Sequence, residues 1–261
     1  MSAQPGHEQV TAAIRAAGEQ GRPALLPFVT AGYPDPAGFI ELLSAVSAAG
    51  DVVEVGVPFS DPMADGVTIQ RASRAAIEAG VSLRWILEQL QAVRAAGHRF
   101  APLVLMSYLN PLYSYGYRRL ATDAAAAGVG AFIVPDLPLE EGAEFRATLA
   151  AEGLGQVQLV TPTTDARRLE AICAASSGFV YAVTTTGVTG GSSGLPADLA
   201  AYLDRVRAVS PLPVCAGFGI RDAEQVRLVG EHADGAIVGS ALVEALERGD
   251  DAKAFVESLR A

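Results

Sequence analysis

Two acidic residues eleven positions apart are the strongest candidates for chemistry in this chain. Glu54 lies inside the apolar segment Val52–Val57, and Asp65 follows in the loop Pro58–Gly66. A carboxylate within an apolar strand costs several kcal/mol unless it is paired or has a function. Two carboxylates in different surroundings can act separately as a general acid/base and as a fixed negative charge. The structural alternatives are an ion pair between Glu54 and an arginine, and helix capping by Asp65.

Three glycine-bearing turns form a second candidate site. They are the segments 186–194, 217–220 and 238–240, and each follows a predicted strand. Such turns present backbone N–H groups at close range, and a helix beginning near Ser240 adds its dipole. Because no lysine and few arginines lie near these turns, we expect amides and a serine hydroxyl to bind a phosphate there. The alternative is that the first segment is a linker and that the other glycines serve packing.

Four aromatic residues fall at or near the ends of predicted strands: Phe28, Tyr108, Tyr181 and Phe218. Aromatic side chains at these places can line an apolar slot for a planar ligand. The alternative is that they belong to the ordinary core of the protein.

Short apolar runs alternate with alanine-rich amphipathic segments along the whole chain. The predicted strands are Ala24–Thr30, Val52–Val57, Pro102–Met106, Ala131–Pro135, Gln156–Thr161, Phe179–Thr184, Pro213–Ala216 and Gly235–Val238. The predicted helices between them are Pro36–Ala49, Leu83–Ala96, Gly116–Ala127, Glu140–Glu152, Asp165–Ala175, Ala197–Val209 and Ala223–Val229. Because the strands are near-continuous apolar runs, we expect them to be buried on both faces, as in a parallel sheet.

Eight strand–helix units in 261 residues without an internal linker predict a (β/α)8 TIM barrel. We expect a single domain, residues 1–261, with an additional N-terminal helix over His7–Ala17 that covers the barrel floor. A doubly wound open sheet is the alternative, but no Gly-x-Gly-x-x-Gly turn follows the first strand. In a barrel, function resides at the carboxyl ends of the strands, where the candidate residues lie.

The composition excludes several classes of function. A net charge of −10 and a pI near 4.8 argue against a nucleic-acid partner. The one lysine, Lys253, stands near the C-terminus, which argues against a Schiff-base mechanism. Two cysteines, Cys173 and Cys215, and three scattered histidines do not predict a metal site. Without a signal sequence or an apolar run of about 20 residues, we expect a cytoplasmic protein with no membrane partner.

Five motifs carry a resemblance to a known family. In chain order they are Phe28–Pro34, Glu54–Gly66, Ile133–Pro138, Thr186–Gly190 and Gly217–Ile220. The chain closely resembles the tryptophan synthase α subunit family from about residue 10 to residue 255. The resemblance implies a (β/α)8 lyase of tryptophan biosynthesis. Its reaction is the retro-aldol cleavage of indole-3-glycerol phosphate to indole and glyceraldehyde 3-phosphate.

The resemblance also implies a role for each candidate residue. Glu54 is the acid/base for indole C3 and for the side-chain hydroxyl, and Asp65 faces the indole N–H. Thr189 meets Asp65 when the loop after the sixth strand closes. The residues implied to bind phosphate are Gly190, Gly219, Gly239 and Ser240. The residues implied to line the indole pocket are Phe28, Tyr108, Tyr181 and Phe218.

Members of the family work as an αββα heterotetramer, so the resemblance implies a β subunit as the partner of this chain. Pyridoxal phosphate is expected in that subunit, which receives indole through a tunnel, and no cofactor is expected in this chain. The residues implied to contact the β subunit are Pro58, Asp61, Asn110 and Pro111.

Three departures from the family pattern affect properties other than the catalytic groups. Val67 replaces a common proline, Thr185 stands where some members have arginine, and Gly130 occupies a place often held by aspartate. They put loop closure and subunit coupling in doubt. An alternative function is therefore a catalytically weak subunit that mainly binds and activates a β partner. A sugar-phosphate isomerase or epimerase is a third hypothesis, but it usually needs metal ligands or histidines at strand ends.

Overall fold

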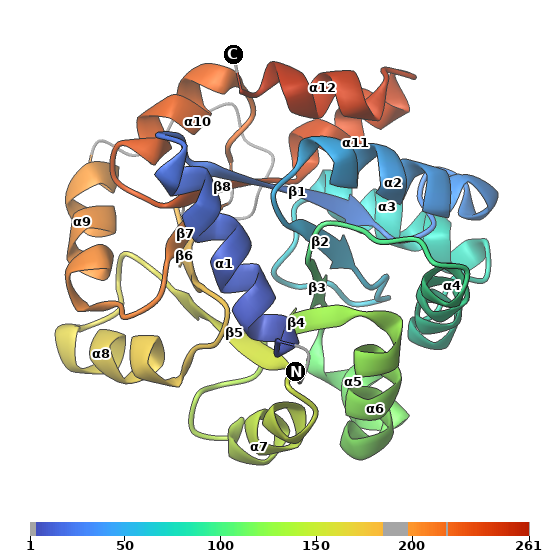
Figure 1. Ribbon diagram of the computed structural model, residues 1–261, viewed down its shortest axis with the longest axis horizontal. Coiled ribbons are helices and arrows are strands. Elements are labelled where there is room, and N and C mark those ends of the chain that lie inside the picture. The colour runs from blue at the N-terminus through green and yellow to red at the C-terminus, as the bar shows by residue number, and fades with distance from the viewer. Residues whose placement is uncertain (1–3, 185–197, 218, 261) are drawn as a thin grey trace.

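The computed structural model describes residues 4–184, 198–217 and 219–260. In these segments eight parallel strands pair in sequence order, and the last pairs with the first to close a barrel (Figure 1). The strands are β1 Ala24–Thr30, β2 Val53–Gly56, β3 Leu103–Met106, β4 Val129–Ile133, β5 Gly155–Val160, β6 Val180–Val183, β7 Val214–Gly217 and β8 Gly235–Val238. The closed sheet confirms the predicted TIM barrel and shows that the doubly wound alternative is wrong.

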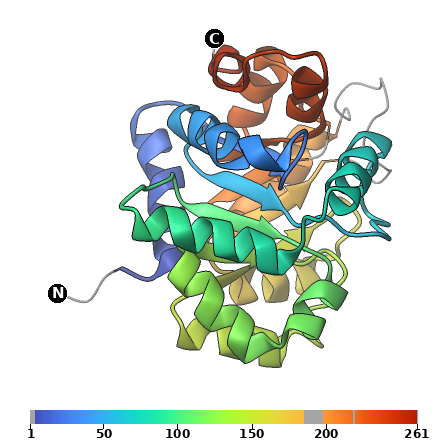
Figure 2. The ribbon, with the colours of Figure 1, turned by 90° about the vertical axis from the view of Figure 1, so that its right-hand side faces the viewer.

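Helices pack around the outer face of the barrel and across its floor (Figure 2). They are α1 Gly6–Glu19, α2 Phe39–Ala49, α3 Val67–Glu78, α4 Leu83–Ala95, α5 Leu109–Tyr115, α6 Tyr117–Ala127, α7 Ala143–Ala151, α8 Ala166–Ala175, α9 Leu199–Val209, α10 Ala223–Gly230, α11 Ser240–Glu247 and α12 Ala252–Ser258. A short 3-10 turn, Pro36–Gly38, precedes α2. Within the described segments, no helix combines the length and apolar character needed to cross a membrane.

Several of the outer helices begin at a polar side chain that caps them. The Ser82 hydroxyl accepts a hydrogen bond from the Trp85 N–H at the start of α4. At the start of α8, Asp165 Oδ1 accepts a hydrogen bond from the Arg168 N–H over 3.0 Å. At the start of α10, Asp222 Oδ1 accepts one from the Gln225 N–H over 2.9 Å. Each cap pairs an N–H group that the first helical turn leaves without a partner, so these residues set where the helices begin.

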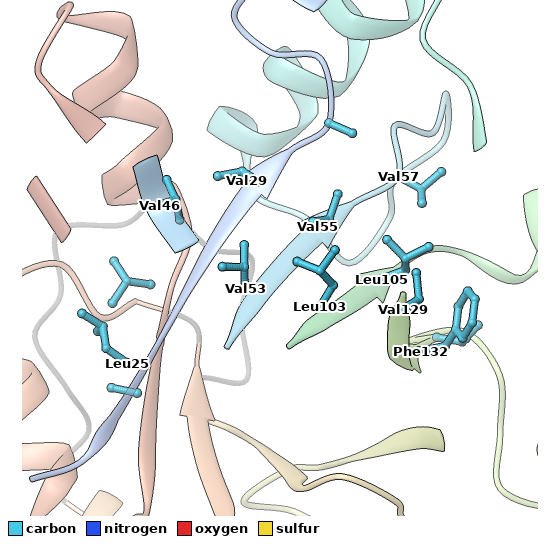
Figure 3. Packing of buried hydrophobic residues seen from close by; sticks show 14 of the residues in the cluster. Leu25, Val29, Val46, Val53, Val55, Val57, Leu103, Leu105, Val129 and Phe132 are labelled. Atoms are coloured by element: carbon cyan, nitrogen blue, oxygen red, sulfur yellow. The ribbon is translucent and has the colours of Figure 1, made fainter. Parts of the chain in front are cut away.

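The strand residues alternate between two apolar layers. In β1, Leu25 and Val29 point outward to the helices, whereas Leu26 and Phe28 belong to the layer inside the barrel. Figure 3 shows part of the outer layer, in which Val46 of α2 joins the side chains of β1 to β4. Because both faces of each strand are buried, the strands read as continuous apolar runs, as predicted.

Helix α1 closes the floor of the barrel, and Figure 1 shows it lying across the near end of the strands. Val10 and Ile14 of this helix are buried against the inner layer. The helix approaches β4 so closely that a Cβ atom at Gly130 would lie 2.7 Å from the Gly6 carbonyl oxygen. Gly130 is therefore explained by helix packing on the floor, and this departure from the family pattern lies at the barrel end opposite the carboxyl ends of the strands.

The structure differs from the sequence prediction at several element ends, and three of the differences have a clear physical reason. Strand β4 begins at Val129, two residues before the predicted start. The expected turn at Asn110-Pro111 is instead the first turn of α5, where a helix tolerates proline because the missing N–H has no helical partner there. Helix α12, which the sequence analysis did not predict, begins after Asp251, whose carboxylate accepts a hydrogen bond from the Ala254 N–H.

Candidate active site

A cavity opens at the carboxyl ends of the strands. The empty space within it, including the open mouth, is about 550 Å³. Its lining consists of Phe28, Glu54, Asp65, Ile69, Met106, Tyr181, Gly219, Ile220, Arg221, Ile237, Gly239 and Ser240. The structure thus brings together the two predicted carboxylates, two of the four aromatic residues and three of the four residues expected to bind phosphate.

Glu54 projects from β2 into the inner layer of the barrel. Its neighbours in the register are Phe28 on β1 and Val104 on β3, and only 2% of the residue is exposed. Among the described residues it forms no ion pair, so the proposed arginine partner is wrong, and its buried Oε2 has no hydrogen-bond partner. Burial, aided by the nearby charge of Asp65, raises the pKa of Glu54 to about 8. A carboxyl group with this pKa is mainly protonated at pH 7 and can donate a proton.

Asp65 lies in the loop between β2 and α3, also at the cavity. The hydroxyl of Tyr108 donates a hydrogen bond to Asp65 Oδ2 over 3.1 Å. Burial raises the pKa of Asp65 to about 6, while the hydrogen bond from Tyr108 opposes that rise. Helix α3 begins after Gly66 without a side-chain cap, so the capping alternative for Asp65 is wrong.

The two carboxylates therefore differ in charge at neutral pH. Glu54, with a pKa of about 8, mostly keeps its proton, whereas Asp65, with a pKa of about 6, is mostly ionised. A proton donor and an ionised carboxylate at one cavity are the combination needed to protonate a substrate and stabilise the cation that forms.

Two aromatic side chains in the cavity lining rest on glycines of neighbouring strands. A Cβ atom at Gly56 would lie 2.4 Å from the ring of Phe28, and one at Gly217 would lie 2.2 Å from the hydroxyl oxygen of Tyr181. Both glycines are therefore required by the close approach of these rings. Ile69, Met106 and Ile237 complete the apolar wall. Sequence analysis did not select these three residues, although their inward alternation in the strands or helix was available as a signal.

Tyr108 is buried but is not part of the cavity lining. Its ring stacks on Phe59 with centroids 5.1 Å apart, and its hydroxyl accepts a hydrogen bond from the Ala64 N–H over 2.9 Å. Together with its bond to Asp65, these contacts make Tyr108 a support for the loop that carries Asp65. The structure does not place it as a wall of the indole pocket.

The phosphate-binding candidates that the structure describes lie at one side of the same cavity. Gly219 follows β7, and Gly239 is the residue before the first turn of α11, which begins at Ser240. Arg221, two residues after Gly219, also lines the cavity, and the sequence analysis overlooked it. The remaining predicted residues, Thr189, Gly190 and Phe218, lie outside the described residues, as does Thr185.

The residues expected to contact a β subunit differ in exposure. Asp61 and Asn110 are exposed and Pro111 is half-buried, whereas Pro58 is buried within its own chain and offers no such surface. Two apolar side chains near these residues in the sequence, Met63 and Tyr113, are 77% and 70% exposed. Because both lie close in the sequence to predicted contact residues, we add them to the candidates for contact with a β subunit.

Other potentially reactive groups stand apart from the cavity lining. Cys173 and Cys215 are buried free thiols, and burial raises the pKa of both. Lys253 lies on α12 with half of its side chain exposed and faces Glu257. Among residues 4–184, 198–217 and 219–260, no three His, Cys, Asp or Glu side chains form a group that could hold a metal ion.

Known proteins resemble the chain over nearly its whole length. The sequence model of the family described as tryptophan synthase alpha chain matches residues 14–261. The tryptophan synthase alpha chain of Nitratidesulfovibrio vulgaris (strain DP4) is 49% identical over 246 residues, which cover 94% of this chain and 95% of the relative. That of Roseiflexus sp. (strain RS-1) is 47% identical over 247 residues, with 92% and 94% covered.

Solved structures agree with the sequence comparisons. A structure of Mycobacterium tuberculosis tryptophan synthase superposes with a TM-score of 0.87 at 38% identity, covering 96% of each chain. Tryptophan synthase subunit alpha from Legionella pneumophila str. Paris also gives 0.87, at 33% identity, over 99% of this chain and 98% of the other. From its sequence, its barrel and its two carboxylates in one cavity, the chain belongs to the tryptophan synthase alpha chain family.

Proposed function

We propose that this cavity is where the chain carries out the reaction of its family. That reaction is the cleavage of indole-3-glycerol phosphate to indole and glyceraldehyde 3-phosphate in tryptophan biosynthesis. The observation that carries the assignment is that Glu54 and Asp65, two carboxyl groups in different surroundings, line one cavity. The apolar wall suits an indole ring, and the glycine-bearing turns suit a phosphate.

Glu54 supplies the proton that makes indole a leaving group. Its carboxyl group protonates C3 of the indole ring, which gives an indolenine cation with its positive charge on the ring nitrogen. The ionised Asp65 faces that N–H and stabilises the cation. The Glu54 carboxylate then accepts the proton of the side-chain hydroxyl. As the C–C bond breaks, its electron pair restores the aromatic indole and the hydroxyl carbon becomes the aldehyde.

The substrate is bound at both of its ends. We assign the indole ring to the wall formed by Phe28 and Tyr181, together with Phe218. We assign the phosphate to Gly219, Gly239 and Ser240, where the N-terminus of α11 favours negative charge. Gly190 is proposed to join them, and Thr189 is proposed to meet Asp65 on loop closure.

We assign a β subunit as the partner, in an αββα complex that receives indole from this chain. Pyridoxal phosphate belongs to that subunit, and the reaction assigned here needs no cofactor. The proposed contact surface for the β subunit consists of Asp61, Met63, Asn110, Pro111 and Tyr113. We expect the β subunit to cover this surface in the complex. A cytoplasmic location and a single domain over residues 1–261 are further parts of the proposal, the latter supported by the pairing of β1 with β8.

The assay for this function measures glyceraldehyde 3-phosphate release from indole-3-glycerol phosphate, with and without a β subunit. We expect slow cleavage by the chain alone, faster cleavage with the β subunit, and loss of activity in Glu54→Gln and Asp65→Asn. Cleavage that survives Glu54→Gln would refute the mechanism. Tight β binding without any cleavage would instead favour the alternative of a binding and activating subunit.

A further inference from the structure

Arg221 lies at the rim of the cavity and is the one cationic side chain among the described residues that line it. The other charged side chains of this lining are the carboxylates of Glu54 and Asp65. A phosphate monoester carries a charge of about −1.5 to −2 at pH 7. The substrate therefore brings negative charge to a cavity with two acidic side chains, and Arg221 is the group that can offset it.

An ion pair fixes the position of the Arg221 guanidinium. Both of its Nη atoms bond to the Glu244 carboxylate, Nη1 to Oε1 over 3.4 Å and Nη2 to Oε2 at closer range. Glu244 comes four residues after Ser240 in α11, so the two residues share one face of the helix, with Cβ atoms about 5–6 Å apart. The ion pair therefore holds the guanidinium beside the first turn of α11, where we place the phosphate.

Glu244 is itself held from a second side. Its Oε1 accepts a hydrogen bond from the Thr68 hydroxyl over 3.2 Å, and Thr68 is buried in the first turn of α3, three residues after Asp65. The bond to Arg221 is the main reason why the pKa of Glu244 is lowered, so this carboxylate stays ionised at neutral pH. Arg221 thus has a permanently charged and doubly anchored partner.

The Arg221 guanidinium has exposed N–H donors that can bind a ligand. Its side chain is 40% exposed, so an anion in the cavity mouth can reach it. An arginine carries five N–H donors in a planar fork that suits phosphate oxygens. Glu244 engages the two Nη atoms, and the Nε–H donates to none of the described residues.

We propose that Arg221 binds the phosphate group of the substrate and that Glu244 is its positioning residue. This inference rests on the proposed function, because it takes the phosphate to lie at Gly219, Gly239 and Ser240. It changes the expectation drawn from the sequence, which assigned the phosphate to backbone amides and a serine hydroxyl alone.

The test compares Arg221→Gln with Arg227→Gln. Arg227 on α10 forms a similar exposed ion pair with Glu231, the residue that follows this helix, but does not line the cavity, so it is a matched control. For Arg221→Gln we expect KM for indole-3-glycerol phosphate to rise about tenfold, with kcat changed less than about threefold, because a charge-assisted hydrogen bond at a half-exposed site is lost. We expect Arg227→Gln to behave as the wild type, and Arg221→Lys to recover part of the loss.

A second measurement tests phosphate binding by Arg221 independently of catalysis. Titration calorimetry with inorganic phosphate should show weaker binding in Arg221→Gln and, to a smaller extent, in Glu244→Gln than in Arg227→Gln. Salt should weaken phosphate binding more in the wild type than in Arg221→Gln. Equal phosphate affinity and equal KM in Arg221→Gln and Arg227→Gln would overturn the role of Arg221 and leave a structural ion pair. A wild-type chain that binds phosphate but cleaves no substrate would refute the proposed function without refuting this role.

Discussion

The hydroxyl of Tyr108 forms two hydrogen bonds to the loop that carries Asp65. It donates to Asp65 Oδ2 over 3.1 Å and accepts from the Ala64 N–H over 2.9 Å. The bond to the carboxylate stabilises its ionised form, and the bond from Ala64 fixes the adjacent backbone. Tyr108 enters from the segment between β3 and α5, so the position of the Asp65 carboxylate depends on a second loop.

Replacing Tyr108 with phenylalanine should raise the pKa of Asp65 above about 6, because the hydrogen bond from Tyr108 lowers it. The acid limb of the pH profile of kcat/KM should move to higher pH, and activity at pH 7 should fall about three- to tenfold. Steady-state assays from pH 5 to pH 9 measure both effects. Tyr115→Phe, which removes a tyrosine–aspartate hydrogen bond to Asp123 outside the cavity lining, is the control. An unchanged acid limb in Tyr108→Phe would show that Tyr108 does not act through Asp65.

The wild-type pH profile should be bell-shaped. Activity requires an ionised Asp65, so kcat/KM rises as the pH passes about 6, and a protonated Glu54, so it falls as the pH passes about 8. The maximum is expected near pH 7. The Asp65 charge helps to raise the pKa of Glu54. In Asp65→Asn, the fall of the residual activity at basic pH should therefore begin at a lower pH than in the wild type. A wild-type profile that stays flat between pH 5 and pH 9 is incompatible with these assignments.

The buried Glu54 should also make stability depend on pH. Its pKa is about 8 in the folded chain and near 4.5 when unfolded, so between these values the folded state binds more protons. The contribution of the protonated Glu54 to the free energy of unfolding is fully present below about pH 4.5 and is lost as the pH rises through 8. The wild type should lose about 2–3 kcal/mol of unfolding free energy between pH 6 and pH 8. Urea unfolding at both pH values should show a smaller loss in Glu54→Gln, and equal losses would contradict the raised pKa.

Restoring the proline at position 67 should stabilise the chain. Val67 is the first residue of α3 and is 68% exposed, and Gly66 before it has φ −75° and ψ 164°, which a following proline requires. Val67→Pro should therefore add about 0.5–1 kcal/mol to the free energy of unfolding by restricting the unfolded chain. Tm should rise by about 1–3 °C in thermal unfolding. Val67→Ala, which lacks the ring constraint, is the comparison, and an equal Tm in both variants would contradict this reason.

Most of the fold could be predicted because its signals are local. The strand prediction Gly235–Val238 matches β8 residue for residue, since an apolar run buried on both faces is visible without tertiary information. The start of β4 was missed because Gly130 reads as a poor strand residue. That glycine is needed only because α1 packs against it, and this long-range contact leaves no signal in the neighbouring sequence.

In the candidate site, too, local sequence signals identify some residues, whereas the roles of others depend on long-range contacts. Glu54 could be selected because a charge inside an apolar run is conspicuous in the sequence. The bond between Tyr108 and Asp65 joins residues 43 positions apart, and Arg221 is paired with Glu244 on another element. Their roles follow from the closure of the barrel and could not be deduced from local spacing.

The most direct test of the account is the titration of the Glu54 carboxyl group by carbon-13 NMR, with Glu54→Gln used to assign its signal. We expect a midpoint of about 8 in the wild type, caused mainly by burial, and a lower midpoint in Asp65→Asn. A wild-type midpoint near 4.5 would mean that Glu54 is ionised at neutral pH. It would then have no proton to give to the indole ring, which would contradict the mechanism proposed for this cavity.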